Sequence, residues 1–429
     1  MVLLGFSQVL GSSYLFQGYR KLDPFILRFI AAEFFIQLMN SAWQLIYNFY
    51  LLDLGYSDTE IANFISARFI LVILLSLPLG LWLSKRQIFP LIRWGMLAIT
   101  FAAIVSLFAT IRKWEVLMTI SLVVFGGGFS LLQIGIIPWL IRVAPPKQQP
   151  EAIALHFASW STAAFLMGLT LWSIHWLETW QMSKPFILGT ATLLGFIGFL
   201  VLPKQVMQEA IQPQEHTKST IMEDFSWRKN TVAIVPQFIL SLGAGLTIPY
   251  ISLFFHAEFQ MPWHDFALMG ALTTLLVASA SMASPIIRLK YGYTGAILGT
   301  QTLGVLALVA MGFTSSLANG TLAMILAISL NMIRQPLFNM SWPVIAEFTM
   351  TFVGKKNHVI TSALRSTIWG LSFFISARLF ILLREQGLSY GEVFIITGVI
   401  NTIGIGGYQY LISIWKRSEP KTADNAALI

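Results

Sequence analysis

One long apolar run carries polar side chains around a permanently charged arginine. The run "LAISLNMIRQPLFNMSWPVIAEFTM", residues 326–350, holds Arg334 together with three amides, Asn331, Gln335 and Asn339. A guanidinium in hydrocarbon costs at least about 2.5 to 3.5 kcal/mol, so it usually faces a bundle interior or an aqueous cavity. Its planar fork suits carboxylate or phosphate groups. We therefore predict that Arg334 and these amides bind an anionic or strongly hydrogen-bonding part of a substrate.

The same arginine also fits a structural role. It could form a salt bridge to another helix, or it could bond backbone carbonyls that Pro336 frees from the helix ladder. The nearest acid in its own run, Glu347, is more than three helical turns away, so no local partner neutralises it. Both interpretations of Arg334 remain open from the sequence.

A second polar line lies in an apolar run near the N-terminus. Its members recur at steps of four, three, four and four, which places them on one helical face: Glu33, Gln37, Asn40, Gln44 and Asn48. Amides both donate and accept hydrogen bonds, so Asn40, Gln44 and Asn48 suit a polyhydroxylated or zwitterionic substrate. They suit hydrogen bonds between helices equally well.

Other ionisable side chains in apolar runs indicate coupling or gating. Glu33 is predicted either to carry a coupling proton or to pair with a basic residue such as Arg28 or Arg365. Arg365 is also expected to pair with Glu347, in a structural or gating contact. His156 can titrate near physiological pH, although a lone histidine in a helix is more often a packing residue.

Two further arginines, Arg68 and Arg378, lie in the outer half of their predicted helices. They either snorkel outward or line an extracellular vestibule. The apolar runs contain no phosphate-binding glycine loop, metal-ligand cluster or nucleophile-base pair. We therefore predict no enzymatic activity, no metal and no cofactor.

These side chains need a membrane around them. Of the 429 residues 56% are hydrophobic and 11% are charged, and the mean hydropathy is +0.72. A spanning helix needs roughly 20 mainly apolar residues, and the chain divides into about twelve such runs: 28–52, 60–84, 90–111, 116–142, 153–176, 185–202, 230–255, 265–288, 292–313, 319–346, 358–383 and 392–415. The alternation typical of spanning strands is absent. The predicted fold is an all-α integral membrane protein.

Positive charges indicate the orientation. Lys and Arg gather before the first run, in the even-numbered connections and in the tail, whereas the odd-numbered connections hold few. This pattern obeys the positive-inside rule, so both termini are predicted to be cytoplasmic, in the plasma (inner) membrane. The net charge of +8 is explained by topology, and no nucleic-acid partner is expected.

The longest polar interruption divides the runs into two sets of six. We predict an N-terminal six-helix half at 1–202, a cytoplasmic linker at 203–229, and a C-terminal six-helix half with a short cytoplasmic tail at 230–429. Weak internal repetition supports this division, because Pro138 stands four residues before Arg142 and Pro343 four before Glu347. Parallel six-helix repeats with a site between them are a transporter architecture.

With these features the chain resembles the major facilitator superfamily over essentially its whole length. The resemblance rests on the twelve-run layout, the linker after run six, "GLWLSKR" at 80–86, "APPKQQPEA" at 144–152 and "LSLGAGLTIPYISLFF" at 240–255. The signature of the second connection is degraded, because Ser84 stands where the acid is expected. The arginine in run four that is typical of proton-coupled members is also missing.

The resemblance implies a secondary active transporter that moves a small polar or anionic solute by alternating access. The competing prediction is a non-transporting relative, either lipid-handling or sensory. The expected partners are a small-molecule substrate, with or without a coupling proton or ion, and membrane lipid. The protein is expected to be a monomer.

Overall fold

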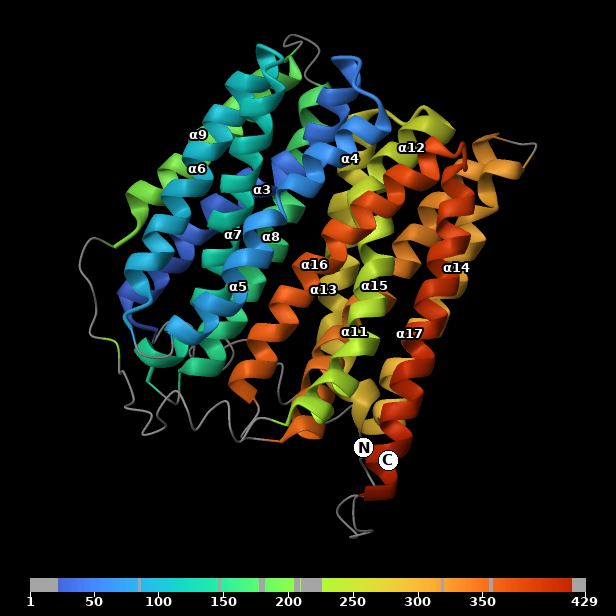
Figure 1. Cartoon of the computed structure of the whole chain (residues 1–429). Coiled ribbons are helices and arrows are strands. Elements are labelled where there is room, and N and C mark those ends of the chain that lie inside the picture. The colour runs from blue at the N-terminus through green and yellow to red at the C-terminus, as the bar shows by residue number, and fades with distance from the viewer. Residues whose placement is uncertain are drawn as a thin grey trace, which may run out of the picture.

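The protein is a bundle of long helices (Figure 1). The computed structural model describes residues 22–83, 86–145, 148–176, 182–203, 209, 226–317, 320–354 and 358–418, and none of these residues lies in a strand. The predicted linker 203–229 lies mostly outside the described residues.

The first set of helices comes from the N-terminal part of the chain and is called the N half here. Its helices are α3 (Pro24–Asp53), α4 (Asp58–Ala67), α5 (Ile70–Leu83), α6 (Phe89–Ile111), α7 (Glu115–Val143), α8 (Gln149–Trp176) and α9 (Lys184–Val201). Helices α4 and α5 together form one broken span.

The second set, called the C half, contains three short 3₁₀ or π elements besides its α-helices. Its elements are α11 (Trp227–Thr247), η1 (Ile248–Tyr250), α12 (Ile251–Phe259), α13 (Trp263–Tyr293), η2 (Thr294–Gly299), α14 (Thr300–Gly312), η3 (Thr314–Ser316), α15 (Gly320–Val353), α16 (His358–Glu385) and α17 (Tyr390–Ser418).

The number of spans agrees with the sequence prediction. In the described residues, 11 stretches are long and apolar enough to cross a membrane. The longest, Trp263–Ser316 with 54 residues, contains both α13 and α14. The chain reverses between them at Gly292, whose φ of 62° favours glycine because it has no Cβ. The protein therefore has about twelve membrane-spanning helices, all α-helical as predicted.

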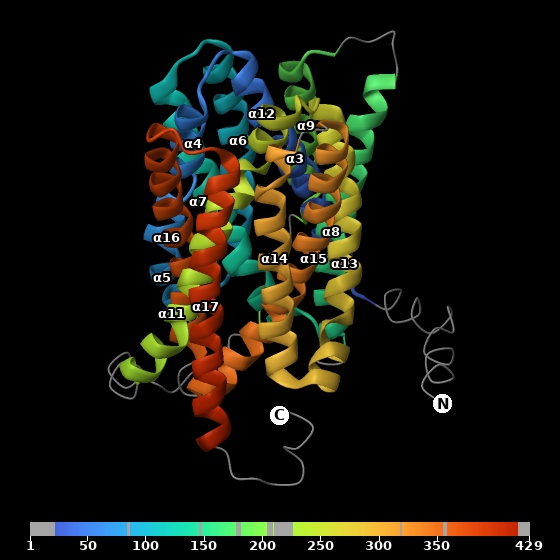
Figure 2. The same ribbon diagram turned by 90° about the vertical axis from the view of Figure 1, so that its right-hand side faces the viewer.

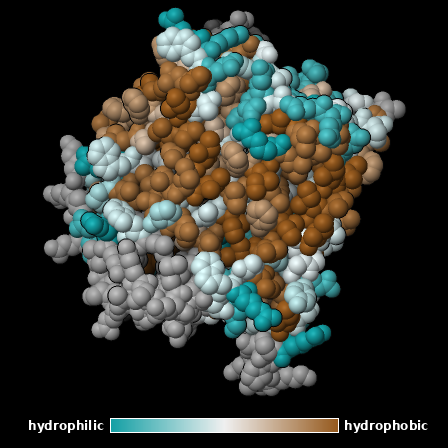
Figure 3. Space-filling view, viewed as in Figure 1, coloured by the Kyte–Doolittle hydropathy of each residue, from teal (hydrophilic) through white to brown (hydrophobic). Residues whose placement is uncertain are grey.

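The two halves stand side by side (Figures 1 and 2). Helix α3 begins and α17 ends at the lower end of Figure 1, which we call the terminal end; the opposite end is the far end. The face seen in Figure 3 carries a broad hydrophobic area with polar residues gathered above and below it. Such a band suits the hydrocarbon core of a bilayer, about 30 Å thick.

The halves share buried apolar contacts at the far end. One cluster fills the N half and extends to C-half side chains near the far end, including Tyr250, Phe254 and Phe380. A second cluster lies near the terminal end of the C half alone and includes Tyr293 and Phe348. Among the described residues, the two halves thus share one hydrophobic core at the far end, and they also touch nearer the terminal end, where a Cβ added to Gly80 of α5 would lie 3.0 Å from the Cβ of Ala363.

A glycine in α7 allows the broken second span to approach closely. The break lies at Arg68 and Phe69, between α4 and α5. A Cβ added to Gly126 would lie 1.7 Å from the carbonyl oxygen of Arg68, so only glycine fits there. This contact fixes where the N half bends.

A residue in the middle of the predicted linker, Glu209, binds the N half. The Glu209 carboxylate accepts hydrogen bonds at 2.8 Å from the backbone N–H groups of Ile88 and Phe89, where α6 begins. Arg142 lies 3.5 Å from the same carboxylate. An anion at a helix N-terminus satisfies free N–H groups and the helix dipole. Glu209 therefore fastens the linker to the terminal end of α6 and α7.

Candidate functional site

Arg334 is buried near the middle of α15, and no described acid pairs with it. Only 2% of its surface is exposed. Its Nη2 donates to Asn331 Oδ1 at 3.0 Å, and in the described part of the chain its Nε has no hydrogen-bond partner. No carboxylate pairs with it among the described residues. The interhelical salt bridge considered from the sequence is therefore not formed there.

The three amides predicted with Arg334 lie along the same helix. Gln335 Nε2 approaches the Asn331 oxygen at 3.5 Å, and Asn339 donates to the Gln335 carbonyl at 2.8 Å. Asn331 also contacts the sulfur of Met269 in α13 at 3.8 Å. The cluster is thus brought together as predicted, but its arginine is enclosed in this conformation.

A cavity of about 310 Å³ lies between the halves, and Arg334 is not among its lining residues. It is bounded by α5 and α7 on one side and by α11, α15 and α16 on the other. Its polar lining residues are Ser76, Ser130, Gln133, Gln237, Ser362, Arg365 and Ser366, and two indoles, Trp342 and Trp369, complete it. Met350 and Ser362 lie close to the terminal ends of α15 and α16, so the cavity occupies the terminal part of the bundle.

Arg365 is the charged residue of this cavity. Its Nε donates to Gln237 Oε1 at 2.7 Å, which holds the side chain from α16 against α11. The predicted pair of Arg365 with Glu347 is wrong, because Glu347 accepts from Arg288 Nη2 at 2.7 Å and from the Tyr293 hydroxyl at 3.3 Å. Glu347 and Arg365 extend from different helices, and a basic residue of α13 reaches the carboxylate.

Glu33 has partners that differ from the arginines predicted for it. It is fully buried in α3. Its Oε2 lies 2.8 Å from His156 Nδ1, and its Oε1 accepts from Trp160 Nε1 at 2.6 Å. Both partners come from α8, so the predicted pairing with Arg28 or Arg365 is wrong. His156 is enclosed between helices, as a packing residue would be, but it also holds a carboxylate.

The amide line of α3 reaches the other half only at its far end. Asn48 Nδ2 donates at 3.0 Å to both the Pro249 carbonyl and the Ser252 hydroxyl. Asn40 is buried and lies 3.5 Å from Gln44 Nε2 within the same helix. Of the three amides predicted to bind substrate, Asn48 thus bonds between the halves, and none of the three lines the cavity.

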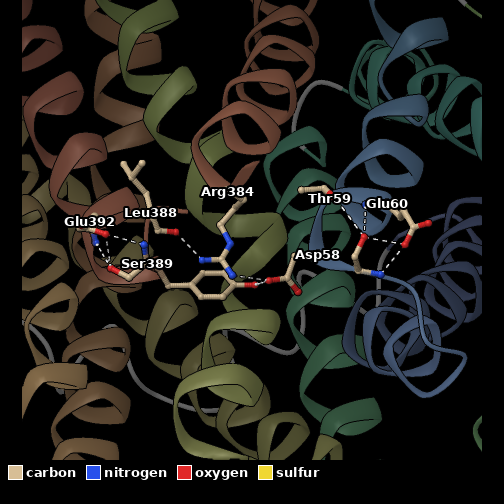
Figure 4. A network of polar contacts seen from close by, with 9 residues as sticks. Asp58, Thr59, Glu60, Arg384, Leu388, Ser389 and Glu392 are labelled. Atoms are coloured by element: carbon tan, nitrogen blue, oxygen red, sulfur yellow. Dashed lines mark hydrogen bonds and ion pairs between the residues drawn. The ribbon is translucent and has the colours of Figure 1, made fainter. Parts of the chain in front are cut away.

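A polar network that was not expected from the sequence closes the far end (Figure 4). Arg384 Nη2 donates to Asp58 Oδ2 at 2.9 Å, and the Tyr390 hydroxyl donates to the same oxygen at 2.6 Å. The guanidinium also lies 4.3 Å from the centre of the Tyr390 ring. The network joins α4 of the N half to α16 and α17 of the C half.

Arg378 and Arg68 differ in their surroundings. Arg378 bonds Asn63 and Ser66 of α4, so it joins the two halves near the far end. Arg68 lies at the α4–α5 break with its guanidinium 4.6 Å from the centre of the Phe125 ring. A vestibule role for these two arginines remains a prediction.

The described residues contain no group of three or more side chains suited to a metal ion. Of the charged residues named above, Arg384, Glu347 and Glu33 have ionisable partners, whereas Arg365 bonds an amide.

The comparisons with known proteins agree with this architecture. The family model described as Major Facilitator Superfamily matches residues 29–377, whereas no curated protein matches the chain. A POT family peptide transporter in an auto-inhibited state has a TM-score of 0.71 and 13% identity, covering 93% of this chain and 98% of its own.

Two other solved structures share the fold. The nucleoside transporter NupG has a TM-score of 0.63 and 14% identity, covering 91% of this chain and 99% of its own. A D-xylose-proton symporter has a TM-score of 0.66 and 10% identity, covering 89% and 96%. Identities this low show a common fold only. From the family match over most of its length, the chain belongs to the major facilitator superfamily.

Proposed function

We propose that the protein is a secondary active transporter that moves a small polar or anionic solute by alternating access. The observation that carries the proposal is the cavity between the halves, which is lined by a guanidinium, amides and hydroxyls. Membrane transport is the activity of the superfamily, and a central site between two six-helix repeats is where such proteins hold their substrate. We assign no enzymatic step to the protein.

The cavity favours a negatively charged solute. Among the described residues that line it, Arg365 is the only ionisable one, so no described carboxylate faces a bound molecule there. The Arg365 Nε donates to Gln237 Oε1, so Nη1 and Nη2 are left to form a bidentate pair with a carboxylate or phosphate. A cationic solute would have to approach this guanidinium in a poorly screened site, which is unfavourable.

The neutral lining favours a compact ring that carries hydroxyl groups. Ser362, Ser366 and the two glutamine amides can form hydrogen bonds with such groups, and the Ser76 and Ser130 hydroxyls, which donate to carbonyls of their own helices, can accept from them. The indoles of Trp342 and Trp369 offer flat apolar faces. A volume of about 310 Å³ lies at the small end of the range for ligand sites. A cyclic hydroxylated monocarboxylate fits all of these properties.

We propose that Arg334 forms a second binding site for the anion, separate from the cavity. It is eight residues from Trp342 along α15, so it lies about 12 Å farther from the terminal end. A buried cation without an acid is costly, and an anionic substrate would supply the missing charge when the far end opens. Asn331, Gln335 and Asn339 would then complete a polar site.

Alternating access follows from where the halves touch. In this conformation the far end is closed by Asp58, Arg384 and Tyr390, while the cavity lies toward the terminal end. We propose that both termini are cytoplasmic in the plasma (inner) membrane of a monomeric protein. This conformation would then face inward, and rupture of the far-end contacts would expose the site to the outside.

Solute flux in reconstituted vesicles tests the proposal. Glucuronate, glucose and glucosamine share one ring and differ in charge, so they separate the effect of charge from that of shape. We expect gradient-dependent uptake of glucuronate above that of the other two. Saturable binding without flux would instead support a non-transporting lipid-handling or sensory protein, and faster uptake of glucosamine would contradict the anionic site.

A further inference from the structure

The outer face of α17 changes from apolar to polar along the helix. Helix α17 lies on the outside of the C half, between α11 and α14 (Figure 2). On this face Val399 and Ile403 are 59% and 60% exposed, so this part of the helix suits contact with lipid chains. Toward the terminal end, steps of three and four residues place polar side chains on the same face: Gln409, Tyr410, Ser413 and Arg417.

A groove of about 330 Å³ runs along the polar part of this face. The described residues that line it all belong to α17: Gly406, Gln409, Tyr410, Ser413, Ile414 and Arg417. A Cβ added to Gly406 would meet nothing within 4 Å, so the face is recessed there for lack of a side chain. The groove therefore connects the apolar stretch at Ile403 with the guanidinium of Arg417.

The groove offers hydrogen-bond donors at its terminal end. Arg417 is exposed, and no described acid pairs with it. The Ser413 hydroxyl donates to the Gln409 carbonyl at 2.8 Å, which leaves the guanidinium, the Tyr410 hydroxyl and the Gln409 amide as donors. A guanidinium beside neutral donors suits a phosphate group. Tyr410 is 63% exposed, as is common for tyrosine at the level of lipid headgroups.

The start of α11 adds positive charge at the same level. A Cβ added to Gly407 would lie 2.8 Å from Pro236 Cγ, so these two residues mark where the helices touch. Arg228 and Lys229, both exposed, precede Pro236 by eight and seven residues. Arg417 follows Gly407 by ten residues. At 1.5 Å per residue, all three cations lie about 10 to 15 Å beyond the contact, toward the terminal end.

The described acids leave this positive charge uncompensated. Helix α11 contains none, and the acid of α17, Glu392, lies at the far end. Glu347 of α15 is paired with Arg288 at 2.7 Å. Lys416 reaches Thr294 Oγ1 at 3.3 Å and brings a further positive charge. The described ends of α11 and α17 therefore favour a negatively charged ligand over a zwitterionic one.

We infer that the groove of α17 is a binding site for one anionic phospholipid, with its phosphate on Arg417 and its acyl chains along Ile403 and Val399. This site is separate from the cavity between the halves and does not depend on the proposed transport function. A soluble anion would gain nothing from the exposed apolar stretch, whereas a phospholipid covers it and presents its charge to the guanidinium.

Native mass spectrometry of the purified protein tests the selectivity. Phosphatidylglycerol and phosphatidylcholine with the same acyl chains differ in net charge, and we expect the wild type to retain one phosphatidylglycerol in preference. Arg417→Gln should weaken this binding about fivefold, the effect of one basic residue near an anionic membrane surface. Arg112→Gln is the matched control, because Arg112 lies against Phe108 at the other end of the bundle. Equal retention of the two lipids by the wild type would contradict an anionic site.

Gly406→Leu tests whether the groove itself binds the lipid. The variant fills the recess and keeps every charge, and leucine favours a helix more than glycine does, so the melting temperature should not fall. We expect it to lose phosphatidylglycerol as Arg417→Gln does. If Gly406→Leu retains the lipid like the wild type, the attraction is diffuse and the inference is wrong. If inorganic phosphate raises the melting temperature as much as phosphatidylglycerol does, the groove binds a soluble anion and the inference is also wrong.

Discussion

Arg384 and Asp58 join the two halves of the bundle by an ion pair of 2.9 Å at the far end. Two similar turns position this contact. Gly55 and Gly387 have φ values of 89° and 84°, and each is followed by a serine that caps the next helix with a glutamate three residues later. Asp58 and Tyr390 occupy the first position after these serines, so the two caps place them against each other.

Loss of this ion pair should open the far end. Asp58→Asn removes the charge that Arg384 and Tyr390 share, and an interaction of about 1.4 kcal/mol shifts an equilibrium about tenfold. Because the chain has no cysteine, Leu45→Cys introduces a single thiol, and all labelling reports on that position. Leu45 is partly buried, and its Cδ2 lies 2.9 Å from the place that a Cβ on Gly270 of the other half would take. We expect an impermeant maleimide at the far side to label it about tenfold faster.

Glu60→Gln is the control for this experiment, because Glu60 caps its own helix and makes no described contact with the C half. Equal labelling rates in Asp58→Asn and the wild type would show that the pair does not hold the closed state.

Replacement of Arg334 should separate stability from binding. Arg334→Gln removes a buried cation that has no acidic partner among the described residues, so the melting temperature should stay equal or rise. Affinity for an anionic solute should fall, and Arg334→Lys should restore it only partly because an ammonium lacks the planar fork. Melting and ligand titration of the same samples measure both. A large drop in melting temperature with normal affinity would assign Arg334 to the structure instead.

The membrane-spanning helices could be predicted from the sequence, but the side-chain contacts between helices could not. Apolar runs of about 20 residues identify spans because a bilayer allows few alternatives. Which side chains meet between helices depends on helix rotation and tilt, which one run does not encode. Arg365 was therefore assigned to Glu347, although it bonds Gln237.

The residues of the far-end network and of the cavity were not predicted, and they differ in whether a sequence pattern could have identified them. The far-end network had one, because the spacing Gly-x-Ser-x-x-Glu occurs both at 55–60 and at 387–392. The residues that line the cavity show almost no recognisable sequence pattern. Ser76, Ser130 and Ser362 look like ordinary small residues of apolar helices, and only the assembled halves bring them together.

The glycine of α7 that contacts the α4–α5 break should tolerate no side chain. In Gly126→Ala the new methyl group would overlap the Arg68 carbonyl, and such overpacking costs about 1 to 3 kcal/mol. Gly406→Ala is the matched control, because a Cβ there meets nothing within 4 Å. We expect thermal unfolding in detergent to show a lower melting temperature for the first variant only. Equal melting temperatures would contradict the close approach.

Labelling of single cysteines should show the orientation. Ser219→Cys and Ser418→Cys place reporters in the predicted linker and at the end of α17. From the distribution of Lys and Arg, an impermeant reagent should reach both only from the cytoplasmic side. Labelling of either residue in intact cells from outside would reverse the proposed orientation.

The central claim is that the Arg365 guanidinium selects an anionic solute for transport. The most direct measurement compares initial rates of glucuronate and glucose uptake into vesicles that contain either the wild type or Arg365→Gln. Loss of a charge-assisted hydrogen bond costs about 1.5 to 3 kcal/mol. The variant should therefore lose about ten- to a hundredfold in kcat/KM for glucuronate, with the glucose rate little changed. An unchanged preference for glucuronate in Arg365→Gln would contradict the account.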